Sequence, residues 1–129
     1  MRLFCWLALF GVLTFLSSCN RKTEIAGFNS QAWKADAGSC KNVRNGMLAE
    51  FEKAKPELFG LAEKEVKAIL GRPDGEELFE RNQRYFYYYI ESGSHCQTKG
   101  KMSGANHIKI RFSALSKVNE ITYAHPIEN

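Results

Sequence analysis

The sequence predicts an α+β domain, in which two N-terminal helices pack on one face of a three-stranded antiparallel meander (α-α-β-β-β). Apolar residues recur at three- and four-residue steps in residues 33–58 and again in residues 61–70, which indicates two amphipathic helices. Three later segments show the two-residue alternation of strands, and only a loop and a short turn separate them. Helices followed by strands are typical of a two-layer α+β fold.

The first helix is expected to be long, starting after Trp33 and ending near Lys55. Its apolar face comprises Cys40, Val43, Met47, Phe51, Ala54 and Leu58. Pro56 disfavours helical geometry at the residue before it, and we therefore place the end of the helix there. Cys40 is expected on the buried face of the first turns. Asp36 and Arg44, eight positions apart, are expected to brace this N-terminal segment.

The second helix is expected over residues 62–70. Its apolar stripe consists of Leu61, Val66, Ile69 and Leu70. Gly71 suits the left-handed position that ends many helices, and Pro73 blocks continuation of the helix. An acidic patch follows and is expected to be a solvated turn rather than an acid–base pair. It contains Glu76, Glu77 and Glu80.

The three strands are expected over residues 84–91, 107–113 and 118–123. One face of the first two strands is expected to contact the helices; it comprises Phe86, Tyr88, Ile90, Ile108, Ile110 and Phe112. The alternation of the third strand slips near Asn119, which predicts a β-bulge. Residues 113–117 are expected to turn the last two strands into a hairpin, and residues 92–106 to form a mobile loop with one fixed point at Cys96.

Residues 1–18 have the pattern of a bacterial lipoprotein signal peptide. Arg2 gives a positive start, and the apolar run that follows ends in two serines and Cys19. This run is too short for a membrane span, which takes about 20 residues. Cys19 is therefore expected to carry the lipid as the first mature residue, with residues 19–32 as a polar tether. The alternatives are an ordinary cleaved secretion signal and a short uncleaved anchor.

The chain left after this signal has room for one small domain, from residue 33 to residue 129. The full chain has 18 Lys and Arg against 14 Asp and Glu, and the signal removes only Arg2. This mild, dispersed excess argues against a nucleic-acid partner. Asn20 is not the aspartate that retains enteric lipoproteins in the inner membrane, which favours an outer-membrane protein facing the periplasm.

Two cysteines remain after Cys5 leaves with the signal and Cys19 takes the lipid. They are Cys40 and Cys96, and an oxidising compartment favours a disulfide between them. The alternative makes Cys96 a reactive thiol beside His95, as in a thiol-dependent enzyme. No C-x-x-C redox pair accompanies it.

The segment from Leu58 to Asp74 resembles the lipoproteins of the BamE/SmpA/OmlA-like group. Its core is E-V-x-x-x-L-G-x-P-D, and a Tyr-rich strand and a hairpin follow it. The same fold occurs in proteinaceous β-lactamase inhibitors. The resemblance covers residues 58–123 and implies an α-α-β-β-β domain with a role in outer-membrane-protein assembly. The long first helix with its cysteine and the Cys96 loop depart from that group and look more like a lipoprotein family of Bacteroidota.

The tyrosine-rich strand supplies the candidate binding surface. Helices cover one face of a sheet, so the other face is expected to be open. The residues expected on it are Tyr85, Tyr87, Tyr89, Lys109 and Arg111. Aromatic and arginine side chains on an open sheet suit protein recognition. The alternative is that these tyrosines only stiffen the strand and pack against long neighbouring side chains.

Metal and cofactor sites are not expected. The three histidines, His95, His107 and His125, match no zinc-ligand spacing, and a thiol in a disulfide cannot ligate a metal. The sequence therefore favours a non-enzymatic, lipid-anchored periplasmic protein that binds another envelope protein through its sheet. The alternatives are an inhibitor- or sensor-like module for a soluble enzyme or ligand and, less favoured, the thiol-dependent enzyme.

Overall fold

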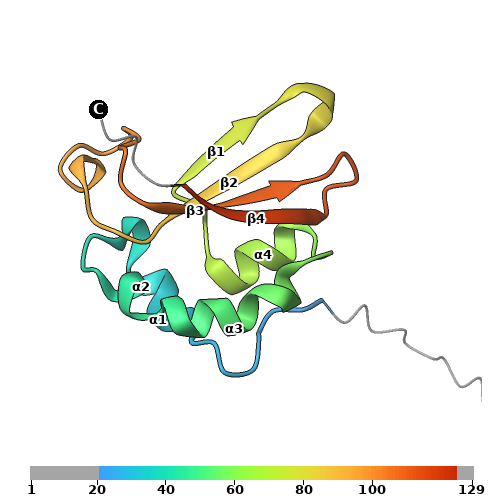
Figure 1. Ribbon diagram of the computed structural model, residues 1–129, viewed down its shortest axis with the longest axis horizontal. Coiled ribbons are helices and arrows are strands. Elements are labelled where there is room, and N and C mark those ends of the chain that lie inside the picture. The colour runs from blue at the N-terminus through green and yellow to red at the C-terminus, as the bar shows by residue number, and fades with distance from the viewer. Residues whose placement is uncertain (1–20, 125–129) are drawn as a thin grey trace, which may run out of the picture.

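The computed structural model describes residues 21–124, and it shows an α+β fold with N-terminal helices followed by a four-stranded antiparallel meander. Figure 1 shows the helices together on one side of the sheet, with the other side uncovered over much of its length. The expected signal peptide, Cys19 and His125 lie outside the described residues.

Two helices have at least seven residues, α3 (Leu48–Leu58) and α4 (Glu63–Leu70). Short helical segments precede them: α1 (Ser30–Ala35), η1 (Ala37–Ser39) and α2 (Val43–Gly46). The strands are β1 (Gly75–Leu78), β2 (Arg84–Tyr89), β3 (His107–Phe112) and β4 (Val118–Ala124). Two further 3₁₀ turns, η2 (Glu80–Asn82) and η3 (Ser94–Cys96), lie in the connections. The sheet order is β1-β2-β3-β4.

The expectation of one long first helix is wrong, because the chain turns twice between residues 36 and 47. Gly38 and Asn42 both have positive φ angles, 74° and 56°, which no α-helix accommodates. The carboxylate of Asp36 accepts hydrogen bonds from the backbone N–H groups of Lys41 (2.8 Å) and Val43 (2.8 Å) and so holds the turn closed. Cys40 consequently lies exposed in a turn, not on the buried face of a helix.

The end of α3 also differs from the expectation, since the helix continues through Pro56 to Leu58. Pro56 lacks the N–H that would bond back to Glu52, but it is exposed, while Leu58 is fully buried in the core. Packing of Leu58 therefore outweighs the local preference. Helix α4 agrees with the expectation, and Gly71 follows it with a φ of 80°, which favours glycine.

Strands β2, β3 and β4 confirm the predicted strands, and the residues predicted to face the helices lie in the core: Phe86, Tyr88, Ile90, Ile108, Ile110 and Phe112. Phe86 pairs with Ile110 in β3, which pairs with Ile121 in β4, and all three side chains lie in the core. The register shifts where Arg111 faces Glu120 and Phe112 faces Val118, so Asn119 forms the expected bulge.

The expectation of three strands is wrong, because the acidic segment after Pro73 forms a fourth. Glu76 pairs with Phe86 and Glu77 with Tyr85 in an antiparallel ladder. This strand is short, lies at the sheet edge and is mostly exposed, so its sequence carries no apolar alternation. It therefore resembles a turn in its composition.

The expectation that residues 19–32 form a simple tether is also wrong for the part that the structure describes, residues 21–32. Ile25 and Phe28 are buried, and Phe28 packs against Trp33 and Phe51 with ring centroids 5.6 and 6.4 Å away. Asn29 caps α1 by accepting a hydrogen bond from Ala32 N (3.0 Å). The packed domain thus begins before residue 33, because the core requires these two side chains.

A buried ion pair joins the helical layer to the sheet. Arg44 donates from Nη1 to Asp74 Oδ2 at 2.7 Å and from Nε to Trp33 O at 3.0 Å, and its side chain is fully buried. Asp74 also accepts backbone N–H groups from Gly38 (2.9 Å) and Tyr89 (2.8 Å). The expected bracing role of Arg44 is therefore present, and its ionic partner is Asp74, just before β1.

Glu65 ties the start of the domain to α4. Its carboxylate accepts the backbone N–H groups of Ala62 (2.8 Å) and Lys22 (3.1 Å). These two hydrogen bonds lower the pKa of Glu65 below its ordinary value.

Replacing Glu65 by glutamine is expected to lower the free energy of unfolding near neutral pH by less than about 1 kcal/mol, because the charged acceptor is lost. A carboxylate whose pKa is lower in the folded than in the unfolded state stabilises the fold at pH values above the unfolded-state pKa. This stabilisation is lost as the pH falls through the folded-state pKa. The difference between wild type and Glu65→Gln, measured by urea unfolding, should therefore shrink and then vanish as the pH falls through the folded-state pKa of Glu65. The matched control is Glu50→Gln, which makes the same substitution at an exposed residue of α3.

Candidate functional site

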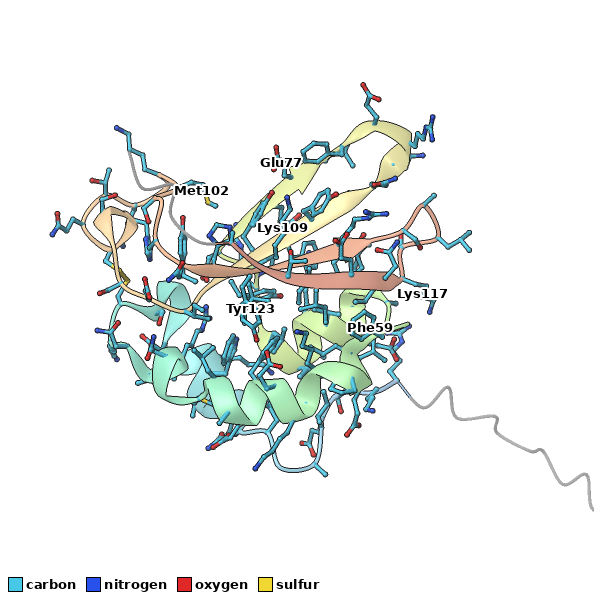
Figure 2. All side chains as sticks on the ribbon, viewed as in Figure 1. Phe59, Glu77, Met102, Lys109, Lys117 and Tyr123 are labelled. Atoms are coloured by element: carbon cyan, nitrogen blue, oxygen red, sulfur yellow. A yellow bond between two sulfur atoms is a disulfide. The ribbon has the colours of Figure 1, made fainter. Side chains whose placement is uncertain are left out.

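The face of the sheet turned away from the helices is the candidate site. Alternation and register place on it one residue in two from each strand. The face is formed by Glu77, Tyr85, Tyr87, Tyr89, His107, Lys109, Arg111, Glu120 and Thr122, with Phe79 just beyond β1. Figure 2 shows Glu77 and Lys109 on this side, above the sheet.

An aromatic cluster with one cation occupies the half of this face nearest the β1–β2 turn. Phe79 and Tyr85 meet edge to face with centroids 5.0 Å apart. Lys109 Nζ lies 4.3 Å from the centroid of Tyr85 and 6.0 Å from that of Phe79. Phe79 is 46% exposed, and the other two side chains are half-buried. The cluster therefore presents aromatic surface and a positive charge to solvent.

The other charges of this face are satisfied within the protein. Arg111 donates to Glu120 Oε2 at 2.9 Å, and Tyr87 donates its hydroxyl hydrogen to Glu77. Lys109 has no carboxylate within ion-pair distance among residues 21–124. It is thus the cation of this face that remains open to an anionic partner group.

Tyr87 and Tyr89 do not lie open, contrary to the expectation for this face. Tyr87 is 8% and Tyr89 is 1% exposed. Burial and then the hydrogen bond to Glu77 raise the pKa of the Tyr87 hydroxyl above its ordinary value, so this hydroxyl remains a donor. Of the expected surface residues, Tyr85, Lys109 and Arg111 are accessible.

Tyr89 is covered because the β2–β3 connection folds back over it. The ring of His95 stacks on the ring of Tyr89 with centroids 3.6 Å apart. The Tyr89 hydroxyl donates to Ser103 O (3.1 Å) and accepts from Ser103 N (2.7 Å). Residues 93–103 therefore pack against Tyr89, and no pattern in the sequence predicted this role.

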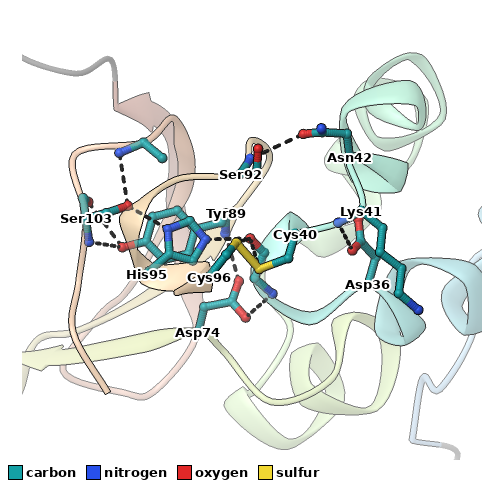
Figure 3. The surroundings of a disulfide bond; sticks show 12 residues. Asp36, Cys40, Lys41, Asn42, Asp74, Tyr89, Ser92, His95, Cys96 and Ser103 are labelled. Carbon is teal, nitrogen blue, oxygen red and sulfur yellow. Dashed lines mark hydrogen bonds between the residues drawn. A yellow bond between two sulfur atoms is a disulfide. The ribbon is translucent and has the colours of Figure 1, made fainter. Parts of the chain in front are cut away.

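The Cys40–Cys96 disulfide confirms the predicted pairing and fixes the same connection to the helical layer (Figure 3). Beside it, His95 Nε2 lies 2.6 Å from Gly38 O and Nδ1 lies 2.6 Å from Ser103 Oγ. Since a carbonyl oxygen only accepts, Nε2 carries a proton. A side chain at Gly38 would crowd the sulfur of Cys40 at 3.2 Å, so this approach depends on glycine.

Two adjoining hollows lie between β1, β2 and the folded-back connection. One, of about 580 Å³, is lined by residues that include Tyr87, Met102 and His107. The other, of about 360 Å³, is lined by the disulfide, His95 and Lys101 among others. Asp74, Gly100 and Met102 line both, so the two hollows form one groove beside the aromatic cluster.

One group of described residues has the spacing of a metal site. The ligand atoms of Cys40, His95 and Cys96 all lie within 4.8 Å of one another. Both sulfur atoms are bonded to each other, however, and both ring nitrogens of His95 have hydrogen-bond partners. A disulfide sulfur is not a thiolate ligand, so this group cannot hold a metal in the oxidised protein.

Two residues that shape this face were missed by the sequence analysis. Phe79 belongs to the aromatic cluster, but it follows a strand that was expected to be a turn. The carboxylate of Asp74 holds β2 at Tyr89 by accepting a hydrogen bond from the backbone N–H of Tyr89. The Gly-Arg-Pro-Asp sequence did mark a turn here, although nothing in it showed that the aspartate pairs with Arg44.

Comparisons of this chain with protein-family models, with curated proteins and with solved structures return no match. Among the helices of residues 21–124, none combines the length and apolarity needed to cross a bilayer.

Proposed function

We propose that this chain is a lipid-anchored periplasmic protein of the bacterial envelope that binds another envelope protein through the open face of its sheet. The observation that carries this proposal is the exposed cluster of Phe79, Tyr85 and Lys109 beside a preformed groove. Aromatic side chains supply contact area with few rotatable bonds, and they dominate the affinity of many protein interfaces.

The charge of the cluster favours an acidic segment as its partner. Lys109 lies against Tyr85 without a carboxylate, while Arg111 and Glu77 have partners of their own. Lys99 and Lys101 add positive charge at the groove nearby. The carboxylates that also line the groove, those of Asp74, Glu76 and Glu77, already pair with Arg44, Lys67 and the Tyr87 hydroxyl. A carboxylate of the partner would form an ion pair with the Lys109 ammonium group, which already contacts an aromatic ring. Aromatic side chains of the partner suit the groove.

The compartment part of the proposal rests on the N-terminal sequence and is supported by the disulfide. The apolar run ending in two serines and Cys19 favours lipidation, and disulfides persist in oxidising compartments such as the periplasm. A placement at the outer membrane and a part in the assembly of its proteins come from the sequence resemblance. Palmitate labelling that persists in a Cys19→Ala variant would contradict the anchor.

Tyr85→Ala is expected to weaken capture of the partner by about 30-fold, which corresponds to about 2 kcal/mol at an aromatic anchor. Lys109→Glu is expected to weaken it as well, by opposing the acidic segment. The partner is first identified by crosslinking in cells with wild-type protein, and its recovery is then measured for each variant. Recovery of β-barrel assembly components would support the assembly role.

The matched control is Lys53→Glu, which makes the same charge change on the exposed side of α3. It should leave capture unchanged. If Tyr85→Ala lowers the melting temperature and capture falls only in proportion to the unfolded fraction, the tyrosine serves the strand and not a partner. Equal recovery by all three variants would also reject the proposed surface.

A further inference from the structure

The end of the domain from which the N-terminal chain departs carries an unusual share of exposed apolar side chains. Six large hydrophobic residues of the described chain are exposed, and four of them lie in segments at this end. They are Phe59 (46%), Leu78 (66%), Phe79 (46%) and Leu115 (83%). In Figure 1 the β1–β2 turn, the β3–β4 turn, the α3–α4 connection and the start of the described chain all lie at the right-hand end.

Hydrogen bonds hold this end together and fix the departing chain to it. Gly60 N donates to Val118 O (2.9 Å), which joins the α3–α4 connection to the β3–β4 hairpin. Lys22 N donates to Glu65 Oε1 at 3.1 Å, at the start of α4. Figure 2 shows Phe59 and Lys117 at this same end.

The distance from the expected lipid to this end is short. Cys19 is three residues before Lys22, and an extended chain spans at most about 3.6 Å per residue, or about 11 Å here. A lipid on Cys19 would therefore keep Lys22 within about 11 Å of the lipidated residue, whatever conformation the connecting residues adopt, and so bring this end of the domain toward the bilayer.

The charges at this end are compatible with an anionic lipid surface. Arg21 and Lys117 form no ion pair within the described residues, and the positive charges of both help to lower the pKa of Glu65. The pairs Lys22–Glu57 and Arg84–Glu63 are neutral as pairs. Exposed apolar loop tips next to cationic side chains are typical of surfaces that enter the headgroup region of a membrane.

We propose that this end of the domain docks on the lipid bilayer, with Leu115 at the tip of the β3–β4 turn entering the interface. The inference rests on the proposed lipidation of Cys19. It adds an orientation to the proposed function, because docking at this end leaves the open face of the sheet pointing sideways, parallel to the membrane surface. In that position the aromatic cluster is accessible to proteins embedded in or attached to the same membrane.

The test uses tryptophan as a depth probe in the mature lipidated protein. Trp33 is fully buried and gives a constant background. Leu115→Trp places a probe at the proposed membrane end (83% exposed), and Met102→Trp places one at an exposed apolar site (52%) in the β2–β3 connection, at the other end of the sheet. Each variant is reconstituted in vesicles of phosphatidylethanolamine and phosphatidylglycerol whose acyl chains carry bromine, which quenches tryptophan on contact.

The emission of Leu115→Trp should shift to shorter wavelength and lose intensity in brominated vesicles, while that of Met102→Trp should do neither. Mass spectrometry of the same samples reports the acyl chains on Cys19. Acylated protein without quenching of Leu115→Trp, or with equal quenching of both probes, overturns the docking orientation and leaves the anchor intact. Protein without acyl chains overturns the anchor itself and, with it, the premise of this orientation.

Discussion

Arg44→Met is expected to lower the free energy of unfolding by about 3 kcal/mol, the largest effect of any single substitution considered. Breaking a buried ion pair by removing one partner typically costs about 3–5 kcal/mol, because the remaining charge stays buried. The lower end applies here, since Asp74 keeps hydrogen bonds from the backbone N–H groups of Gly38 and Tyr89. Methionine retains much of the apolar stem of the arginine, so the loss reports mainly on the charge. Urea unfolding at neutral pH measures it.

The matched control is Arg111→Met, which removes the exposed pair with Glu120 on the open face. Exposed ion pairs contribute only about 0–1 kcal/mol, so this variant should remain close to wild type. A double-mutant cycle with Asp74→Ala separates the coupling of the buried pair from the effects of each side chain. If Arg44→Met and Arg111→Met destabilise equally, the buried pair does not join the two layers as described.

Removing the disulfide is expected to have an effect of similar size, about 4 kcal/mol for a sequence separation of 56 residues in the chain-entropy model. The double substitution Cys40→Ser and Cys96→Ser frees the β2–β3 connection from the helical layer. His95 should then lose its position on Tyr89, because residue 96 no longer holds its neighbour in place. Thermal unfolding and the hydrogen-exchange protection of residues 93–103 measure the two consequences.

A reductant provides the internal control for this prediction. It should lower the melting temperature of the wild-type protein and leave that of the double-serine variant unchanged. A wild-type melting temperature that does not respond to reduction, although thiol titration shows both cysteines free, would contradict a stabilising role of this bond. The thiol-dependent enzyme remains an untested alternative; it would require one of these two sulfur atoms as a free thiol.

The sequence predicted those parts of the fold in which burial of one face imposes a regular spacing of apolar residues. Strand β3 alternates apolar and polar residues because one face meets the helices, and α4 shows an apolar stripe for the same reason. Strand β2 is instead an aromatic run in which the last four residues are all buried. The bulge at Asn119 was visible because it breaks such a period. The Cys40–Cys96 pair followed from counting cysteines.

The parts that were missed depend on contacts between distant residues. The break after α1 was masked because Cys40, Val43 and Met47 keep a helical spacing by coincidence, although Gly38 and Asn42 are frequent turn residues. The edge strand β1 lacks an apolar face and pairs only because Tyr85 and Phe86 lie beside it. The burial of Tyr89 depends on how the disulfide places His95, which no local pattern reports.

Site-specific photo-crosslinking in living cells distinguishes an open sheet face that docks a partner from one that has only a structural role. A photo-reactive phenylalanine derivative, which keeps an aromatic ring, is placed at position 85 on this face and, as the control, at position 53 on α3. Position 85 is expected to yield a discrete adduct with one envelope protein, Lys109→Glu to abolish this adduct, and position 53 to yield none. Adducts of the same protein from position 53, or an adduct at position 85 that persists with Lys109→Glu, would contradict docking at this face.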